Sequence, residues 1–263
     1  MVLITGAGSG LGKALSILLS SKKARVVMVS RDQSRLDQTT SEIEQGGGIA
    51  SSYQFDLGDI SQIPDLHKKI VANVGGAPTI LLNVVGYQVV GLVGNTPTDV
   101  FAQNYRVNLV APVSLIQCVL PSMVRNGRGI IANVMSSIMY RSFPGVSSYC
   151  ASKRALGAVH ESLKSELEGT GVKTLYIRPG SFKSRYWENT DVGERIQNFI
   201  APSIDGFNDP ENVAKRICLA LEVGDDRLCL DTYKDKIGRH MSYWCPRLLD
   251  RVIDRKNRYQ VKV

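Results

Sequence analysis

The sequence has few cysteines, and none of them lies close enough to another to form a metal-binding or redox motif. The chain of 263 residues contains five and no CxxC pair: Cys118, Cys150, Cys218, Cys229 and Cys245. An odd and dispersed set is typical of a reducing compartment and argues against both a disulfide framework and a zinc site. We therefore expect a cytoplasmic protein that binds no metal.

Long apolar runs are also absent. No stretch of about 18 consecutive apolar residues occurs, so we predict no membrane span. The first residues, MVLITGAGSG, lack the basic start and the long apolar centre of a signal peptide, and we expect none. No internal repeat, low-complexity linker or break in composition marks a second domain.

The composition is otherwise that of an ordinary globular protein, but the charge is uneven. Hydrophobic residues make up 43% of the chain and charged residues 21%, so the core needs no disulfide or metal to hold it. The net charge is +8, yet residues 234–263 alone carry nine Lys or Arg against three Asp. The rest of the chain is therefore nearly neutral, and the excess positive charge belongs to the C-terminal segment.

Short apolar runs alternate with helical patterns as far as about residue 231. The runs predict strands at 2–5, 25–30, 52–56, 79–85, 130–135, 173–177 and 227–231. The patterns predict helices at 11–20, 34–45, 59–73, 98–125, 147–168 and 210–222, with Pro112 and Pro121 as bends or ends of the longest. This order indicates an α/β fold: a doubly wound parallel sheet in a three-layer α/β/α, Rossmann-type single domain. Ligands of such folds bind at the carboxyl ends of the strands.

The first predicted strand runs directly into a glycine-rich segment, TGAGSGLG, at residues 5–12. Gly6, Gly10 and Gly12 allow the backbone to approach a phosphate, and a helix that starts near Gly10 directs its N-terminus at that anion. The alternative is a tight strand-to-helix turn without a ligand. The position of the segment, at the start of a βαβ unit, favours dinucleotide binding.

The end of the second predicted strand indicates which dinucleotide binds. An acidic residue there accepts a hydrogen bond from the ribose 2′-hydroxyl of NAD, whereas an Arg accommodates the 2′-phosphate of NADP. The strand ends in VVMVS and Arg31 follows, so Ser30 and Arg31 favour NADPH. Asp32 is one residue late for the acidic role, and an Arg in a surface loop is the plain alternative.

Tyr149 and Lys153 stand four positions apart in SSYCASKRAL, a stretch without His or carboxylate. On a helix this spacing places them on one face, one turn apart. A fixed positive charge lowers the pKa of a nearby phenol, so we expect Tyr149 to exchange a proton near neutral pH. An incidental pair on a surface helix is the alternative.

Three motifs, TGAGSGLG at 5–12, NVVG at 83–86 and YCASK at 149–153, together resemble the short-chain dehydrogenase/reductase family. The resemblance extends from Val2 to about Asp231 and leaves residues 232–263 as a basic extension that we expect to be helical. It implies a seven-stranded parallel sheet, a nicotinamide cofactor, and a homodimer or homotetramer paired through the long helices. NVVG departs from the family pattern, because Val84 and Val85 replace two small or polar residues.

The resemblance also implies a catalytic set: Ser136, Tyr149, Lys153 and Asn108. In that set Tyr149 is the general acid, Ser136 positions the carbonyl group, Lys153 supports the phenolate and holds the nicotinamide ribose, and Asn108 holds a water that returns the proton. Ser137 is the alternative to Ser136. The implied cofactor contacts are Thr5, Gly6, Ser9, Gly10, Leu11, Gly12, Ser30, Arg31, Asp56, Leu57, Asn83, Gly86, Tyr149, Lys153, Pro179, Gly180, Phe182 and Ser184.

We therefore expect an NADPH-dependent carbonyl reductase that converts a ketone or aldehyde into an alcohol. An NADP-linked alcohol dehydrogenase that works in the oxidative direction and a non-catalytic regulator that binds the cofactor are the alternatives. The residues expected to line the pocket are mainly apolar and aromatic, which favours an apolar substrate: Tyr87, Gln88, Met139, Tyr140, Phe143, Tyr186 and Trp187. Arg141, Lys183 and Arg185 would instead suit an anionic tail.

The C-terminal extension contains an amphipathic helical pattern, WCPRLLDRVIDRKNR, at residues 244–258. Its apolar side chains share one face and its arginines another: Leu248, Leu249, Val252 and Ile253 against Arg247, Arg251 and Arg255. Such a helix lies on an anionic membrane surface, packs on a partner subunit or caps its own domain. We expect no nucleic-acid binding, because charge is present without a groove-reading motif.

Overall fold

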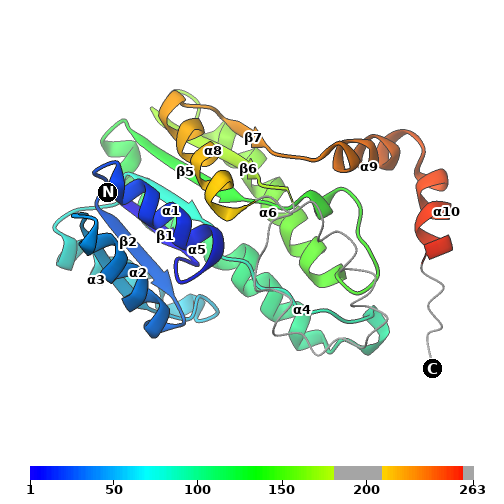
Figure 1. The fold of residues 1–263 in the computed structure, drawn as a ribbon, viewed down its shortest axis with the longest axis horizontal. Helices are drawn as coiled ribbons and strands as arrows, with labels where there is room; N and C mark the ends of the chain where they lie inside the picture. Colours follow the sequence, from blue (N-terminus) through cyan, green and yellow to red (C-terminus); the bar gives the residue numbers. More distant parts are fainter. Residues whose placement is uncertain (181–208, 257–263) are drawn as a thin grey trace.

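The computed structural model describes residues 1–180 and 209–256, with a seven-stranded sheet at its centre (Figure 1). The strands are β1 (Val2–Thr5), β2 (Val26–Ser30), β3 (Ala50–Gln54), β4 (Ile80–Asn83), β5 (Gly129–Val134), β6 (Val172–Arg178) and β7 (Arg227–Cys229). Their order is β3-β2-β1-β4-β5-β6-β7, and every neighbouring pair is parallel. The order reverses between β1 and β4. This confirms the doubly wound fold, and a ligand crevice is expected at that reversal.

Helices cover both faces of the sheet. On one face lie α1 (Gly10–Ser21), α2 (Gln33–Gln45) and α8 (Pro210–Val223), and on the other α3 (Ile63–Val74), α5 (Ala111–Arg125) and α6 (Ser147–Glu166). Successive side chains of a strand point to opposite faces, so Ile4 belongs to the first core and Leu3 to the second. Because both faces are covered, the strands read as continuous apolar runs.

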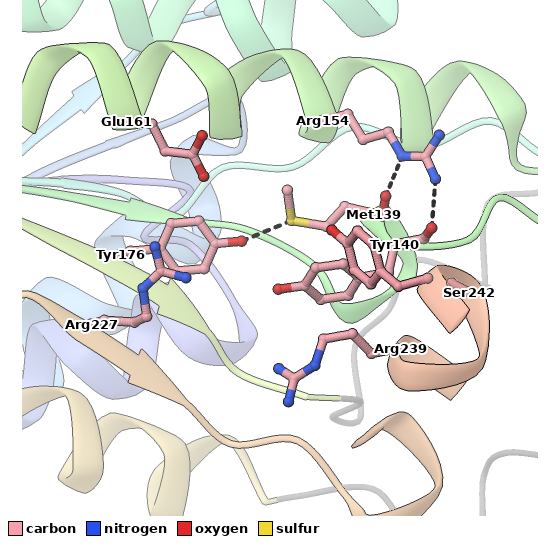
Figure 2. Close-up of a pocket in the computed structure, with 9 residues that line it drawn as sticks. Met139, Tyr140, Arg154, Glu161, Tyr176, Arg227, Arg239 and Ser242 are labelled. Atoms are coloured by element: carbon pink, nitrogen blue, oxygen red, sulfur yellow. Dashed lines mark hydrogen bonds between the residues drawn. The ribbon is translucent and has the colours of Figure 1, made fainter. Parts of the chain in front are cut away.

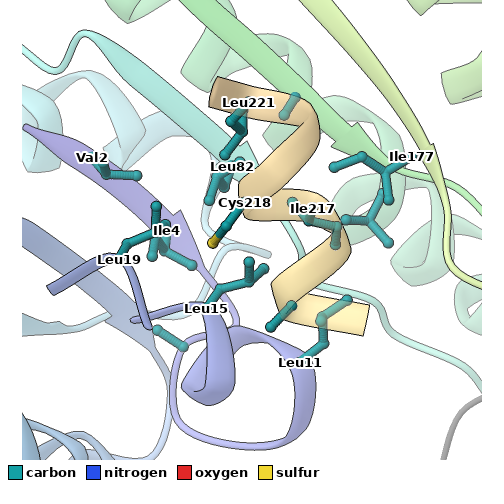
Figure 3. Close-up of a cluster of buried hydrophobic side chains, with 14 of the residues drawn as sticks. Val2, Ile4, Leu11, Leu15, Leu19, Leu82, Ile177, Ile217, Cys218 and Leu221 are labelled. Carbon is teal, nitrogen blue, oxygen red and sulfur yellow. The ribbon is translucent and has the colours of Figure 1, made fainter. Parts of the chain in front are cut away.

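Close packing on the first face fixes the N-terminus of α1. Leu15 of α1 and Cys218 of α8 lie together against Leu82 of β4 (Figure 3), and each is at most 2% exposed. The start of α1 lies so close to the preceding loop that a Cβ atom at Gly12 would overlap the carbonyl group of Gly6. A residue larger than glycine at position 12 would push α1 away from the end of β1.

The long helical region expected at 98–125 is present but interrupted. It consists of α4 (Thr98–Tyr105), a π-helical turn (Arg106–Val110) and α5. Pro112 lies at the start of α5, directly after the π-helical turn, so one of the two prolines predicted as bends or ends coincides with the interruption. Pro121 lies inside α5, and the prediction that it ends the helix was wrong.

By length and composition alone, this 28-residue stretch is apolar enough to cross a membrane. Its second half instead supplies Leu115, Val119 and Met123 to the core on the second face, each at most 1% exposed. A core helix of an α/β domain passes the same test, so the apolar character has a structural reason here.

Two further helices, α9 (Tyr233–Trp244) and α10 (Pro246–Lys256), follow β7 and extend beyond the sheet (Figure 1). α9 begins with a capping box, in which Thr232 and Asp235 bond each other's backbone N–H groups. An ion pair between Asp250 and Arg141 ties α10 to the loop after β5. Both helices therefore contact their own domain.

Candidate active site

The glycine loop joins β1 to α1 beside the reversal of strand order. Gly6 has a φ of +69° and Gly10 a φ of +51°, which only glycine adopts readily. A Cβ atom at Gly6 would lie 3.0 Å from the Cα of Val85, so the loop packs directly on the segment after β4. Nothing lies within 4 Å of a Cβ atom at Gly10, so the loop is open to a ligand on that side.

The N-terminus of α1 has groups available for an anion. Ser9 precedes the helix, but its side chain forms no capping hydrogen bond, and the first turn contains no acidic residue. The N–H groups at a helix start carry a partial positive charge. The hydroxyl of Thr5 accepts from the N–H groups of Val84 and Val85 at 3.1 and 3.2 Å, which holds the opposite wall in place. The loop therefore fits the diphosphate of a dinucleotide.

The carboxylate of Asp32 contacts its own helix. It caps α2, accepting from the N–H of Arg35 at 3.2 Å and from the hydroxyl of Ser34 at 2.8 Å. The Arg35 guanidinium pairs with the same carboxylate at 2.9 Å. Asp32 thus has a structural role at the start of α2, and the choice of cofactor stays a prediction.

Arg35 is a basic residue beside the glycine loop that we did not predict. A Cβ atom at Gly8 would lie 2.9 Å from the Oγ of Ser30 and 3.4 Å from the Cβ of Arg35. Ser30 and Arg35 therefore lie beside the glycine loop, and Arg31 follows the end of β2 directly. The spacing in the sequence could have indicated Arg35, because it follows Arg31 by four residues, about one helical turn.

The other predicted cofactor residues lie at the ends of further strands. After β3, the carboxylate of Asp56 accepts from the N–H of Gly58 at 2.8 Å, and Leu57 is buried. After β6, Pro179 and Gly180 are buried, and Gly180 has a φ of +70°. The predicted site residues that lie outside the described ranges are Phe182, Lys183, Ser184, Arg185, Tyr186 and Trp187.

Ser136 and Tyr149 meet at the carboxyl end of β5. Their hydroxyl groups form a side-chain hydrogen bond, and Tyr149 is buried in the first turn of α6. Burial raises the pKa of Tyr149 to about 12, although the bond from Ser136 lowers it. The expectation that the neighbouring ammonium group makes this phenol acidic was wrong, because desolvation outweighs it.

Lys153 lies one turn further along α6 and is only 2% exposed. Its Nζ donates to the carbonyl oxygen of Val134 at 2.9 Å and to that of Val85 at 3.5 Å. The ammonium group therefore connects the end of β5 with the segment against which the glycine loop packs. Burial lowers the pKa of Lys153 to about 8.

Asn108 lies in the π-helical turn and holds the backbone after β4. Its Nδ2 donates to the carbonyl oxygen of Tyr87, and its Oδ1 accepts from the N–H of Tyr87, both at 2.7 Å. Nδ2 also donates to the Oγ of Ser152 at 3.0 Å. Asn108 thus joins three elements and fixes the residue after Gly86. Its side-chain amide is engaged by protein groups, and the expected water remains a prediction.

A buried chain of polar side chains, which we did not predict, runs from β4 to α6. Nδ2 of Asn83 donates to Oδ1 of Asn133 at 2.8 Å, and Nδ2 of Asn133 lies 3.0 Å from Nδ1 of His160. Since an amide N–H only donates, Nδ1 of His160 is the acceptor and its proton is on Nε2. The spacing in the sequence could have indicated His160, because it follows Lys153 by two helical turns and so lies on the same face of the helix. The chain links β4, β5 and α6.

These groups together suit proton and hydride chemistry on a bound dinucleotide. The site combines the glycine loop and the uncapped N-terminus of α1 with a buried pair of hydroxyl groups and one buried ammonium group. Within residues 1–180 and 209–256, no group of three or more His, Cys, Asp or Glu lies close enough together to hold a metal ion.

We predict that His160 makes stability depend on acid. Burial, reinforced by the charges of Arg227 and Lys164, lowers its pKa from 6.5 to about 4. Between these pH values the unfolded chain binds a proton that the folded chain does not, so the free energy of unfolding falls as the pH falls. His160→Gln should lose this part of the pH dependence in urea unfolding at pH 7, 5.5 and 4.5.

His240→Gln is the matched control, because His240 is an exposed histidine on α9, outside the buried hydrogen-bond chain. The prediction fails when His160→Gln retains the acid sensitivity of the parent, or when His240→Gln removes it.

Known proteins that resemble this chain support the same reading of the fold. It is 32% identical over 221 residues to a protein named ketoacyl reductase HetN from Nostoc sp., covering 84% of this chain and 75% of that protein. It is 31% identical over 229 residues to dehydrogenase/reductase SDR family member 7B from Danio rerio, covering 84% and 74%. The chain thus spans about three quarters of the length of these two relatives.

Solved structures share the fold at lower identity. A metagenomic short-chain oxidoreductase in complex with NADP has a TM-score of 0.73 at 24% identity, covering 88% of this chain and 96% of that one. A short-chain dehydrogenase from Streptomyces avermitilis has a TM-score of 0.77 at 24% identity, covering 95% and 96%. The short chain dehydrogenase family itself matches residues 1–194. The chain therefore belongs to the short-chain dehydrogenase family of oxidoreductases.

Proposed function

We propose that the chain is an NADPH-dependent carbonyl reductase that converts a ketone or aldehyde into an alcohol by hydride transfer. The observation that carries this proposal is the hydrogen-bonded hydroxyl pair of Ser136 and Tyr149, buried beside the ammonium group of Lys153. A regulator that only binds the cofactor would need no such buried set. The names of two similar proteins, a ketoacyl reductase and an oxidoreductase in complex with NADP, support this proposal.

Each residue has a separate task in this mechanism. Reduced nicotinamide, when bound, supplies the hydride for the carbonyl carbon. Tyr149 is protonated at neutral pH, because its pKa is about 12, and donates its proton to the oxygen as negative charge develops there. Ser136 donates a hydrogen bond that orients the same oxygen. Lys153 has one N–H donor beyond its bonds to Val134 and Val85, and this donor would hold the nicotinamide ribose.

Tyr149 serves either direction of the reaction, because the proton that the phenol donates in reduction is the one that its phenolate takes up in NADP-linked alcohol oxidation. The neutral phenol, from which reduction starts, is the form present at neutral pH.

We propose an apolar carbonyl compound as the substrate. Phe143 packs with Val90, Val146 and Cys150 beside the loop that joins Ser136 to α6, so the surroundings of the hydroxyl pair include an apolar cluster. Met139 and Tyr140, which we expected in the same pocket, contribute instead to a separate cavity.

Removal of the phenolic hydroxyl tests the proposed acid. Tyr149→Phe should lower kcat about 10²- to 10⁴-fold, the range typical of general acid–base catalysis. Its affinity for NADPH should match that of the parent, since the ring and Lys153 remain. Turnover is measured as NADPH consumption over a panel of ketones and aldehydes, and binding by fluorescence titration.

Tyr233→Phe, at a position that is 78% exposed on α9, is the matched control and should leave kcat unchanged. A parent rate in Tyr149→Phe would contradict the mechanism. NADPH binding without turnover of any carbonyl compound in the parent would instead support the regulator.

The choice of NADPH over NADH is tested at Arg31 and Arg35. Loss of a charge-assisted bond to the 2′-phosphate weakens binding about tenfold or more. Arg31→Gln and Arg35→Gln should therefore each raise the KM for NADPH at least about tenfold and leave the KM for NADH unchanged. Arg31→Gln is the cleaner variant, because Arg35→Gln also removes the ion-pair partner of Asp32.

Arg216→Gln, at an exposed position on α8, controls for a general loss of positive charge. Equal effects on both coenzymes, or a parent that prefers NADH, would contradict the NADPH assignment.

We also propose that residues 1–231 are the catalytic domain and that residues 232–263 form an extension with a peripheral contact to an anionic membrane. Tyr233, Ile237 and Trp244 are 78%, 42% and 80% exposed, and their spacing places them on one stripe of α9. Exposed basic residues accompany them in the same segment: Lys236, Arg247 and Arg251. Aromatic and basic side chains on one amphipathic segment suit a lipid interface. Assembly into a homodimer or homotetramer remains a prediction.

Vesicle flotation tests this contact. The parent should float with vesicles that contain phosphatidylserine, and Tyr233→Ala/Trp244→Ala should stay in the soluble fraction. Leu219→Ala, which removes a 53% exposed apolar side chain from α8, is the matched control and should float. No flotation of the parent, or a dimer in light scattering that the double variant abolishes, would contradict the membrane contact.

A further inference from the structure

A second pocket lies beside the loop that follows Ser136. Figure 2 shows this cavity, which has a volume of about 590 Å³. Its lining residues come from the loop after β5, from α6, β6 and β7, and from α9: Met139, Tyr140, Arg154, Glu161, Tyr176, Arg227, Arg239, Ser242 and Tyr243. In the described part of the chain this lining includes none of Ser136, Tyr149 and Lys153, so the cavity is not the catalytic crevice.

The cavity has an excess of positive charge. Arg154, Arg227 and Arg239 come from three elements that are far apart in the sequence, and Glu161 is the one acidic residue among those that line it. Among the described residues, none of the three arginines forms an ion pair with Glu161. The guanidinium groups repel one another because they carry like charges close together. An anion bound in the cavity would offset this repulsion.

One further acid contacts a cavity arginine. Asp231 receives two hydrogen bonds from the guanidinium of Arg178, which is fully buried. Arg239 donates to the same carboxylate and forms an ion pair with it at 3.3 Å. Asp231 is therefore one negative charge shared by two arginines, and the positive charge around the cavity stays in excess.

Tyrosine rings hold two of the guanidinium groups in place. The Cζ of Arg227 lies 4.6 Å from the ring centroid of Tyr176, and the Cζ of Arg239 lies 5.6 Å from that of Tyr140. A guanidinium that stacks on a ring keeps its N–H donors in its own plane, where they remain available to oxygen atoms. Such preorganised donors match the oxygens of a phosphate group.

We propose that this cavity binds the phosphate group of a small phosphorylated compound whose organic part lies against the tyrosines. With Arg178 and Asp231 counted beside the lining residues, four arginines against two acidic residues leave an excess of two positive charges, which complements a phosphate dianion. Tyr140 and Tyr243, with rings 6.4 Å apart in an edge-to-face arrangement, supply a wall for an apolar or aromatic group. Arg154 donates to the carbonyl oxygens of Met139 and Tyr140, so the site adjoins the segment that follows Ser136.

Calorimetric titration of the NADPH-loaded protein with phenyl phosphate tests the site, because NADPH occupies the glycine loop. Phenyl phosphate should bind more tightly than either inorganic phosphate or phenol, since it satisfies both parts of the cavity. Arg227→Gln/Arg239→Gln should weaken the binding at least tenfold, while Arg216→Gln should leave it unchanged.

A second variant keeps the test decisive when the double variant does not fold. Ser242→Phe fills the cavity from α9 and retains all three arginines, so it should also abolish phenyl phosphate binding. The same titration on the cofactor-free protein applies when NADPH does not bind. Binding that neither variant weakens, equal affinity for phenol and phenyl phosphate, or no binding at about 10 mM would each overturn the proposal.

Discussion

The burial of one ammonium group among backbone carbonyls determines the geometry of the catalytic crevice. Lys153 donates to Val134 at the end of β5 and approaches Val85 after β4, so α6 is attached to both strands next to the glycine loop. Taking an ammonium group out of water is costly, and the lowered pKa of Lys153 is the direct consequence. The carbonyl oxygens offset that cost only when α6 lies in this one position. Tyr149, one turn earlier, is thereby held against Ser136.

The polar groups of the domain gather at one end of an otherwise apolar core. Below the strand ends the two cores consist of aliphatic side chains that are almost fully buried. At the strand ends Asn83, Asn133 and His160 form one chain of buried hydrogen bonds, and Asn108 forms another set around Tyr87. Hydrogen bonds need a fixed geometry, whereas apolar contacts do not. The buried hydrogen bonds therefore specify where the site residues lie, and apolar packing makes the domain compact. The ends of β4 and β5 are therefore held by side-chain hydrogen bonds as well as by packing.

The sequence predicted the order of strands and helices well, because buried parallel strands and amphipathic helices have different periods. It also brought Ser136, Tyr149 and Lys153 to one place, through the family resemblance and helical spacing. Ends of elements were less accurate: β3 begins at Ala50 rather than residue 52, since its polar side chains are only half-buried and give little periodic signal. Pro121 lies inside a helix because packing of α5 in the core overrides local preference.

Burial and long-range contact explain what the sequence did not predict. The spacing of Tyr149 and Lys153 suggested a lowered phenol pKa, but desolvation depends on what covers the ring, and no spacing contains that information. His160 and Arg35 were missed because their partners, Asn133 and the glycine loop, are distant in the sequence. The cavity arginines converge only when β7 and α9 are placed beside α6.

The protonation of Lys153 is the most direct test of this account. Lysine labelled with ¹³C at Cε reports the ionisation of each side chain by NMR, and the resonance lost in Lys153→Met identifies the one that matters. The account predicts a midpoint of about 8 for this resonance in the cofactor-free protein, compared with the ordinary value of 10.5. A midpoint near the ordinary value would show that the ammonium group is in water, and that it does not hold α6 against the sheet.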